Sequence, residues 1–144
     1  MKFYDDLAVG DTASFGTYQV TRDEIVSFAQ QYDPQPFHTD EAAAESSMFG
    51  GLVASGWHTG AMTMRLLVDN YLSGSGALGA LGVDDLRWPT PVEPGDELAV
   101  RIEILEKEVW DETRGRVATE ITTTNDDGAV VLSMVAQVLW RRRD

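Results

Sequence analysis

The stretch SGWHTGAMTMRLLVDNYL, residues 55–72, has almost no polar face when it is placed at helical spacing. Met62, Leu66 and Leu67 add apolar side chains outside its main apolar stripe, which consists of Trp57, Ala61, Met64, Val68 and Tyr71. A helix that is hydrophobic all round is a buried helix. The pattern therefore predicts that the rest of the chain surrounds residues 55–72.

The second half of the chain supplies segments that can surround this helix. Alternating or two-faced apolar patterns predict strands at residues 79–88, 98–104, 117–122 and 130–140, and a shorter one near residues 13–20. Short turn-forming runs separate the later strands, at residues 94–96, 111–115 and 125–128. Short links favour antiparallel hairpins. We predict an α+β fold, a single domain over residues 1–144 in which a curved antiparallel sheet wraps one long apolar helix.

The composition limits the classes of function. The 144 residues carry a net charge of −13, which disfavours nucleic acid and anionic membranes as partners, because both attract basic surfaces. The chain has no cysteine, so disulfides, thiolate nucleophiles and cysteine-bound zinc are excluded. No apolar run reaches the ~20 residues of a membrane span, and the acidic N-terminus does not resemble a secretory signal. We expect a cytoplasmic protein.

A possible catalytic pair lies in YDPQPFHTD, residues 32–40. Upstream, Thr21 and Glu24 have the spacing of a capping box, which predicts a helix that Pro34 must end. Asp33 would then leave the helix, and two prolines would hold an extended spacer between it and His38. A rigid Asp/His pair can bind one water molecule between a base and a hydrogen-bond partner.

A second element of the site is the start of the long helix at Ala54, Ser55 and Gly56. The first N–H groups of a helix have no intrahelical acceptor, and the helix dipole is positive there. Such a terminus can stabilise negative charge on a carbonyl oxygen. Gly56 has no side chain, so a thioester carbonyl could approach its amide closely.

These residues resemble the MaoC-like dehydratase family, which includes the R-specific enoyl-CoA hydratases. The run from Asp33 to His38 is similar to the family's hydratase motif, with Gln35 where the motif commonly has asparagine. Further similarity lies in Phe49-Gly50, in Gly56 and in LRWPTPVEPGDEL, residues 86–98. The resemblance covers nearly the whole chain.

The resemblance implies a hotdog fold, a homodimer or a larger assembly of dimers, and no metal or redox cofactor. It implies reversible hydration of a trans-2-enoyl thioester of coenzyme A or an acyl carrier to a 3-hydroxyacyl thioester, commonly the R isomer. Asp33 would be the general base toward water, His38 would polarise the water and relay its proton, and the Gly56 amide would bind the thioester oxygen. Gln35, Ser55 and Trp57 would contact the substrate.

Alternatives from the residues stay open. A hotdog thioesterase would share the fold, and a binding domain that is not an enzyme would not need Asp33 or His38. The spacing of His38, Asp40 and Glu41 matches no established metal site. His58 is expected to pack or to line the substrate. Arg141–Arg143, the only basic cluster, would be either a solvated chain end or a phosphate contact.

Overall fold

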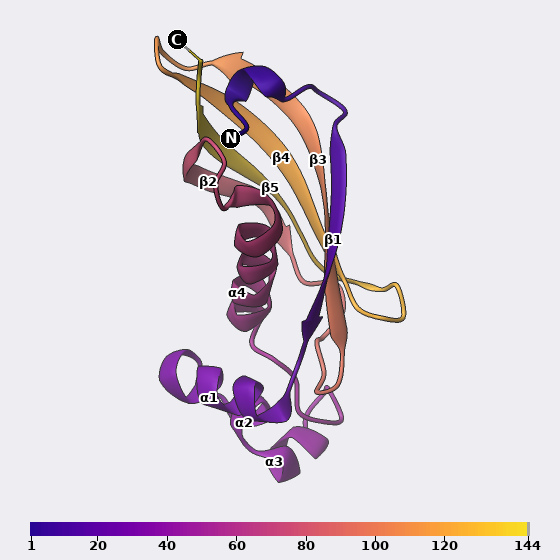
Figure 1. Cartoon of the computed structure of the whole chain (residues 1–144). Coiled ribbons are helices and arrows are strands. Elements are labelled where there is room, and N and C mark those ends of the chain that lie inside the picture. Colours follow the sequence, from indigo (N-terminus) through magenta and orange to yellow (C-terminus); the bar gives the residue numbers. More distant parts are fainter. Residues whose placement is uncertain (144) are drawn as a thin grey trace.

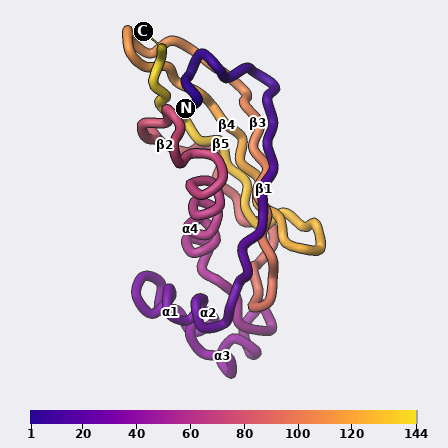
Figure 2. Tube along the Cα trace, viewed as in Figure 1, coloured from indigo at the N-terminus to yellow at the C-terminus, as the bar shows by residue number. Residues whose placement is uncertain are grey.

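The computed structural model describes residues 1–143 as one curved antiparallel sheet with the helices on one side of it (Figures 1 and 2). The five strands lie in the order β1-β3-β4-β5-β2. They are β1 (Thr12–Gln19), β2 (Ala77–Arg87), β3 (Glu97–Val109), β4 (Arg114–Thr124) and β5 (Val130–Arg141). All five strands match predicted segments, so the predicted α+β architecture is confirmed.

The helices lie between β1 and β2 in sequence, apart from a short 3₁₀ turn near the N-terminus, η1 (Tyr4–Asp6). They are α1 (Arg22–Tyr32), α2 (Pro36–Thr39), α3 (Glu41–Glu45), α4 (Gly56–Leu67) and the π-helical turn η2 (Val68–Leu72). The sheet curves around α4, while α1, α2 and α3 cluster below the N-terminal end of α4 (Figure 1). Within residues 1–143, none of the helices combines the length and the apolar composition that crossing a bilayer requires.

The core lies between α4 and the concave face of the sheet. Ile102 of β3 pairs with Ile121 of β4, and both are buried against the same cluster as Met62 and Leu66 of α4. Burial of each such side chain contributes about 1.5–3 kcal/mol. The Thr63 hydroxyl lies 2.7 Å from the Thr123 hydroxyl, so the buried polar groups between α4 and β4 satisfy each other.

The predicted cap of α1 forms only in part. The Thr21 hydroxyl accepts a hydrogen bond from the Glu24 N–H at 3.2 Å, as the capping box requires. The Glu24 carboxylate accepts instead from the Tyr18 hydroxyl of β1, 2.8 Å from its Oε2. Partial burial, followed by the contact with Glu24, raises the pKa of Tyr18 to about 12. The prediction missed this because a long-range partner competes for the carboxylate.

The expectation that residues 33–38 are extended is wrong in its second half. Residues 36–39 form the single turn α2, with Pro36 at its first position and the Asp40 N–H donating to the Pro36 carbonyl at 2.9 Å. Proline is tolerated there because the first N–H groups of a helix need no intrahelical acceptor and the fixed φ suits the helix. The turn brings His38 back toward Asp33.

The prediction that residues 55–72 are buried on all sides is also wrong. His58, Met62 and Leu66 face the core, but Trp57 and Met64 are 64% and 46% exposed. The exposed side continues onto β2, whose residues are almost all exposed. Periodicity shows that this face of α4 is apolar, but it cannot show whether the chain itself covers that face.

Candidate active site

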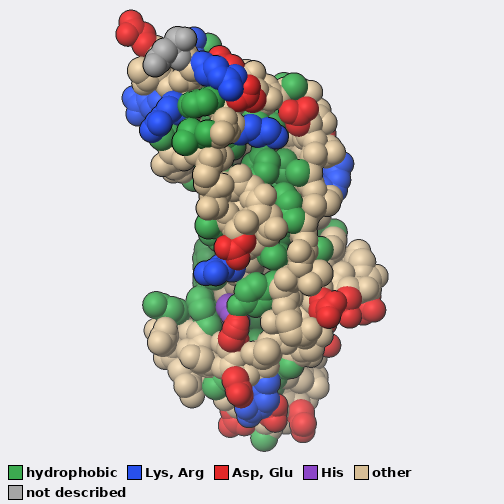
Figure 3. Space-filling view, viewed as in Figure 1, with side chains coloured by type: hydrophobic (Ala, Val, Ile, Leu, Met, Phe, Trp, Pro, Cys, Tyr) green, Lys and Arg blue, Asp and Glu red, His purple; other side chains and the backbone are tan. Residues whose placement is uncertain are grey.

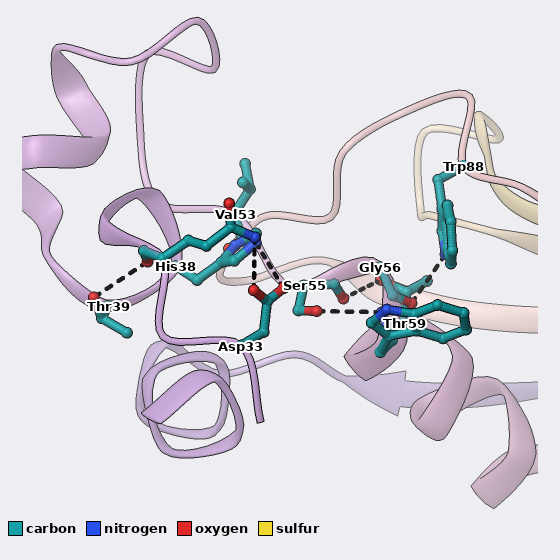
Figure 4. Close-up of polar contacts among 10 residues, drawn as sticks. Asp33, His38, Thr39, Val53, Ser55, Gly56, Thr59 and Trp88 are labelled. Atoms are coloured by element: carbon teal, nitrogen blue, oxygen red, sulfur yellow. Dashed lines mark hydrogen bonds and ion pairs between the residues drawn. The ribbon is translucent and has the colours of Figure 1, made fainter. Parts of the chain in front are cut away.

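Asp33 and His38 meet at the lower end of α4, where Figure 4 shows their side chains facing each other. The Asp33 Oδ2 atom lies 3.3 Å from the His38 Nε2 atom, and the two side chains are 18% and 7% exposed. Asp33 is the C-cap of α1 and His38 belongs to α2. The end of one helix and the turn of the next therefore fix the pair.

The other nitrogen of His38 sets the proton arrangement of its ring. Nδ1 lies 2.7 Å from the Val53 carbonyl oxygen. A carbonyl only accepts hydrogen bonds, so Nδ1 carries a proton, and the role of Nε2 toward Asp33 depends on the charge of the ring. In the cationic ring Nε2 donates to Asp33, and in the neutral ring it is free to accept a proton.

Gln35 holds the carboxylate from the other side. Its amide Nε2 donates to Asp33 Oδ1 at 2.6 Å. This hydrogen bond, helped by the Ser55 hydroxyl and by the charge of His38, lowers the pKa of Asp33 below its usual value against the opposing effect of burial. Gln35 and Ser55 were predicted to contact substrate, and the structure places both beside the catalytic candidate Asp33.

The N-terminus of α4 forms the next part of the site. The buried Ser55 caps the helix by accepting from the Trp57 N–H at 3.3 Å. The preceding segment is tied down because the Ala54 N–H donates to the Val92 carbonyl at 2.8 Å. Gly56 is the first residue of the helix, so its N–H has no acceptor within the helix.

Trp88, which follows β2, was not predicted to belong to the site. Its indole Nε1 donates to the Gly56 carbonyl at 2.9 Å (Figure 4), and its ring meets that of Trp57 edge to face. A Cβ atom on Gly56 would lie only 2.7 Å from Trp88 Cε2. The close packing of the indole therefore requires a glycine at this position. No spacing in the sequence indicates that residue 88 reaches residue 56.

A cavity of about 470 Å³ collects all the predicted site residues, namely Asp33, Gln35, His38, Ser55, Gly56 and Trp57. Phe37, Phe49, Pro91 and Val92 make much of its remaining wall apolar. His58 is not among the lining residues. It is buried against Phe28, with ring centroids 4.7 Å apart and planes 9° from parallel, and burial lowers its pKa. His58 therefore packs in the interior.

The cavity is apolar with one Asp/His pair at its polar end. The carboxylate can accept a proton, the imidazole can donate one, and the Gly56 N–H can stabilise charge on an oxygen. Such an arrangement suits addition or removal of water next to a carbonyl group.

Comparisons with known proteins agree with this reading. The MaoC-like dehydratase from Rhodospirillum rubrum has 44% identity and a TM-score of 0.91, with 99% of this chain and 98% of that one covered. R-hydratase PhaJ1 from Pseudomonas aeruginosa has 31% identity and a TM-score of 0.77, with coverage of 98% and 86%. The uncharacterized protein YdeM of Bacillus subtilis is 28% identical over 138 residues, which is 96% of this chain and 98% of YdeM.

These similarities establish the fold as a hotdog fold. The sequence model of the MaoC-like domain family matches residues 7–126, which include the Asp/His pair, the start of α4 and Trp88. The chain therefore belongs to the MaoC-like dehydratase family.

Proposed function

We propose that the protein hydrates a trans-2-enoyl thioester to a 3-hydroxyacyl thioester and catalyses the reverse dehydration. The contact between Asp33 and His38, 3.3 Å apart at the polar end of an apolar cavity, is the observation that carries this proposal. The similarity to the R-hydratase PhaJ1 supports the same reaction, with an R product. The carrier of the acyl group is coenzyme A or an acyl carrier.

In the proposed reaction, ionised Asp33 takes a proton from water, and the water oxygen bonds to the β-carbon of the enoyl group. The π electrons move toward the thioester oxygen, where the Gly56 N–H stabilises the developing negative charge. Cationic His38 gives its Nε2 proton to the α-carbon. The proton on Asp33 then passes to His38 and restores the pair, so one water has been added. No electron leaves the substrate, and the reaction requires no redox cofactor.

The test is the absorbance of the conjugated enoyl thioester on addition of the protein to short, branched and medium-chain enoyl-CoAs. Loss of absorbance without release of thiol is the expected result. Release of thiol would indicate a thioesterase. Tight binding of the thioesters with neither signal would indicate a binding domain.

We also propose that the protein is a homodimer whose contact is the exposed apolar face of α4 and β2. Met64 of α4 and Leu78, Ala80 and Val83 of β2 line one apolar hollow of about 320 Å³. β2 is an edge strand of the sheet, so its outer backbone groups can pair with another strand. A second copy related by a two-fold axis offers the same edge, antiparallel to the first.

Val83→Arg is expected to shift the protein from dimer to monomer. Val83 is 47% exposed on β2 and lines the apolar hollow, so a charge buried in the proposed contact should weaken association about 100-fold. Light scattering after size-exclusion chromatography measures the mass directly. Val109→Arg is the matched control, because Val109 is 59% exposed at the end of β3 and lies outside this face. A dimer that tolerates Val83→Arg as well as Val109→Arg uses another surface.

Gln35→Met is expected to move the acid limb of kcat/KM to higher pH. Asp33 must be ionised to accept a proton, so the rate falls as pH drops through the Asp33 pKa. Gln35 lowers that pKa by donating at 2.6 Å, and methionine removes the donor at similar length. The pH profile of kcat/KM measures the shift, and Gln35→Asn tests whether a shorter amide restores the original limb. An unchanged acid limb in Gln35→Met would show that Gln35 does not affect the group whose ionisation limits kcat/KM.

A further inference from the structure

The proposed function leaves the negative charge of the substrate carrier unmatched. Coenzyme A carries a diphosphate and a further phosphate, and a chain of net charge −13 repels such a ligand. Among the residues that line the active-site cavity there is no lysine or arginine. Within one chain, the cavity can therefore hold an acyl group, but no cationic side chain lines it to bind the phosphates.

Arginines gather in a different place. We call this place the arginine hollow. Its volume is about 700 Å³, and its walls are formed by Phe3, Leu78, Thr113, Arg114, Arg141, Arg142 and Arg143. Four of the 11 basic residues of the chain line it. Figure 3 shows basic side chains concentrated at the end of the molecule where the chain termini lie.

The four arginines of the hollow differ in their partners. Arg114 pairs with Asp111, and Arg143 pairs with Asp6. Within residues 1–143, neither Arg141 nor Arg142 forms an ion pair with a carboxylate. Arg142 donates from Nη1 to the Asp111 carbonyl at 2.6 Å, and its Nε is buried and has no partner in that part of the chain.

The arginine hollow and the active-site cavity lie at opposite ends of β2. Leu78, the second residue of β2, lines the hollow, while Trp88, directly after the strand, lines the cavity. Eleven residues of strand span roughly 35 Å at about 3.3 Å per residue. The four arginines of the hollow are therefore far from the cavity of the same chain, and Figure 1 shows the chain termini at the opposite end of the molecule from α1, α2 and α3.

A two-fold dimer paired along β2 removes this separation. In such a contact residue i of one copy meets residue j of the other, and residue j meets residue i. When β2 pairs with itself antiparallel over its length, Leu78 of one copy lies beside the Arg87 end of the other. The hollow of each copy then borders the cavity of its partner.

We infer that Arg141 and Arg142 bind the phosphates of the coenzyme A thioester whose acyl group lies in the partner's cavity. This inference rests on the proposed hydration of an enoyl thioester and on the proposed dimer. It assigns coenzyme A as the carrier and makes each active site incomplete without the second copy. Guanidinium groups suit this task because they donate two parallel hydrogen bonds to a phosphate.

The first experiment compares an enoyl-CoA with the corresponding enoyl-pantetheine thioester, which lacks the nucleotide phosphates. In Arg141→Gln/Arg142→Gln the KM for the CoA thioester should rise about tenfold, and the KM for the pantetheine thioester should stay within about twofold. Arg101→Gln is the control, because Arg101 lies on β3 and pairs with Glu103. An equal rise for both thioesters would overturn the assignment. A selective loss with an acyl carrier protein substrate, and none with coenzyme A, would also overturn it.

The second experiment asks which copy supplies the arginines. Mixed dimers are purified from co-expressed Asp33→Asn and Arg141→Gln/Arg142→Gln chains that carry different tags. The only cavity with Asp33 then belongs to the chain without these arginines, and its partner retains them. A KM equal to that of the wild type, with about half its kcat, is expected if the arginines act across the dimer. The raised KM of the arginine variant would show that they act within one chain, and would refute the inference.

Binding of free coenzyme A separates this inference from the proposed function. Calorimetric titration needs no turnover, so weaker binding to Arg141→Gln/Arg142→Gln than to Arg101→Gln supports the arginine hollow even if no enoyl thioester reacts. Equal binding by the two variants refutes it, even if hydration is observed. A monomeric wild-type protein would also refute the inference that the second copy completes each active site.

Discussion

Asp33→Asn is expected to lower kcat for enoyl-thioester hydration about 1,000-fold, the scale of a lost general base. The substitution keeps the size and shape of the side chain, and its Oδ1 can still accept from Gln35. It removes the only carboxylate that contacts His38 among residues 1–143. Because an amide does not accept a proton from water, the bond between water and the β-carbon should form slowly while substrate binding is largely kept.

The measurement is single-turnover loss of enoyl absorbance, with the midpoint of thermal unfolding recorded for the same samples. Asp23→Asn is the matched control, since it makes the same chemical change at an exposed residue in the first turn of α1. Asp23→Asn should hydrate like the wild type. A fully active, folded Asp33→Asn protein would remove Asp33 from the mechanism and would leave His38 as the base to be tested.

Much of the fold was predictable because it depends on local pattern. The alternation Leu98, Val100, Ile102 marks one face of β3, and all three are buried. Thr21 caps α1, and Pro34 ends it. These signals work because side-chain spacing and proline geometry act within a few residues.

The site residues were predictable only where they belong to the recognised sequence motif. Asp33 and His38 are five positions apart, and one helical turn brings them together. The role of Gln35 as a donor to Asp33 depends on a side-chain rotamer that spacing does not fix. Trp88 reaches Gly56 across 32 positions of sequence, through the path of the chain after β2. The exposed face of α4 shows a related limit, since an apolar stripe does not reveal whether its own chain or a second copy covers it.

Gly56→Ala is expected to reduce kcat/KM about 100-fold and to destabilise the fold by about 1–3 kcal/mol. The new Cβ would lie 2.7 Å from Trp88 Cε2 and 2.9 Å from Cδ2, so the fused ring must move or the first turn of α4 must shift. Either movement disturbs the hydrogen bond from the indole to the Gly56 carbonyl and displaces the N–H that we propose stabilises the thioester oxygen. Steady-state kinetics and denaturant unfolding measure the two effects.

Gly60→Ala is the control on the same helix, because nothing beyond the neighbouring residues and backbone of α4 lies within 4 Å of its added Cβ. Alanine there should stabilise α4 by up to about 1 kcal/mol and leave the rate unchanged. Adding Trp88→Ala to Gly56→Ala removes the ring that the methyl group meets. Recovery of stability without recovery of rate would show that the indole is needed to position the Gly56 amide, whereas recovery of both would limit its role to occupying space. A Gly56→Ala protein as active and as stable as Gly60→Ala would mean that neither the close packing nor the amide position matters for turnover.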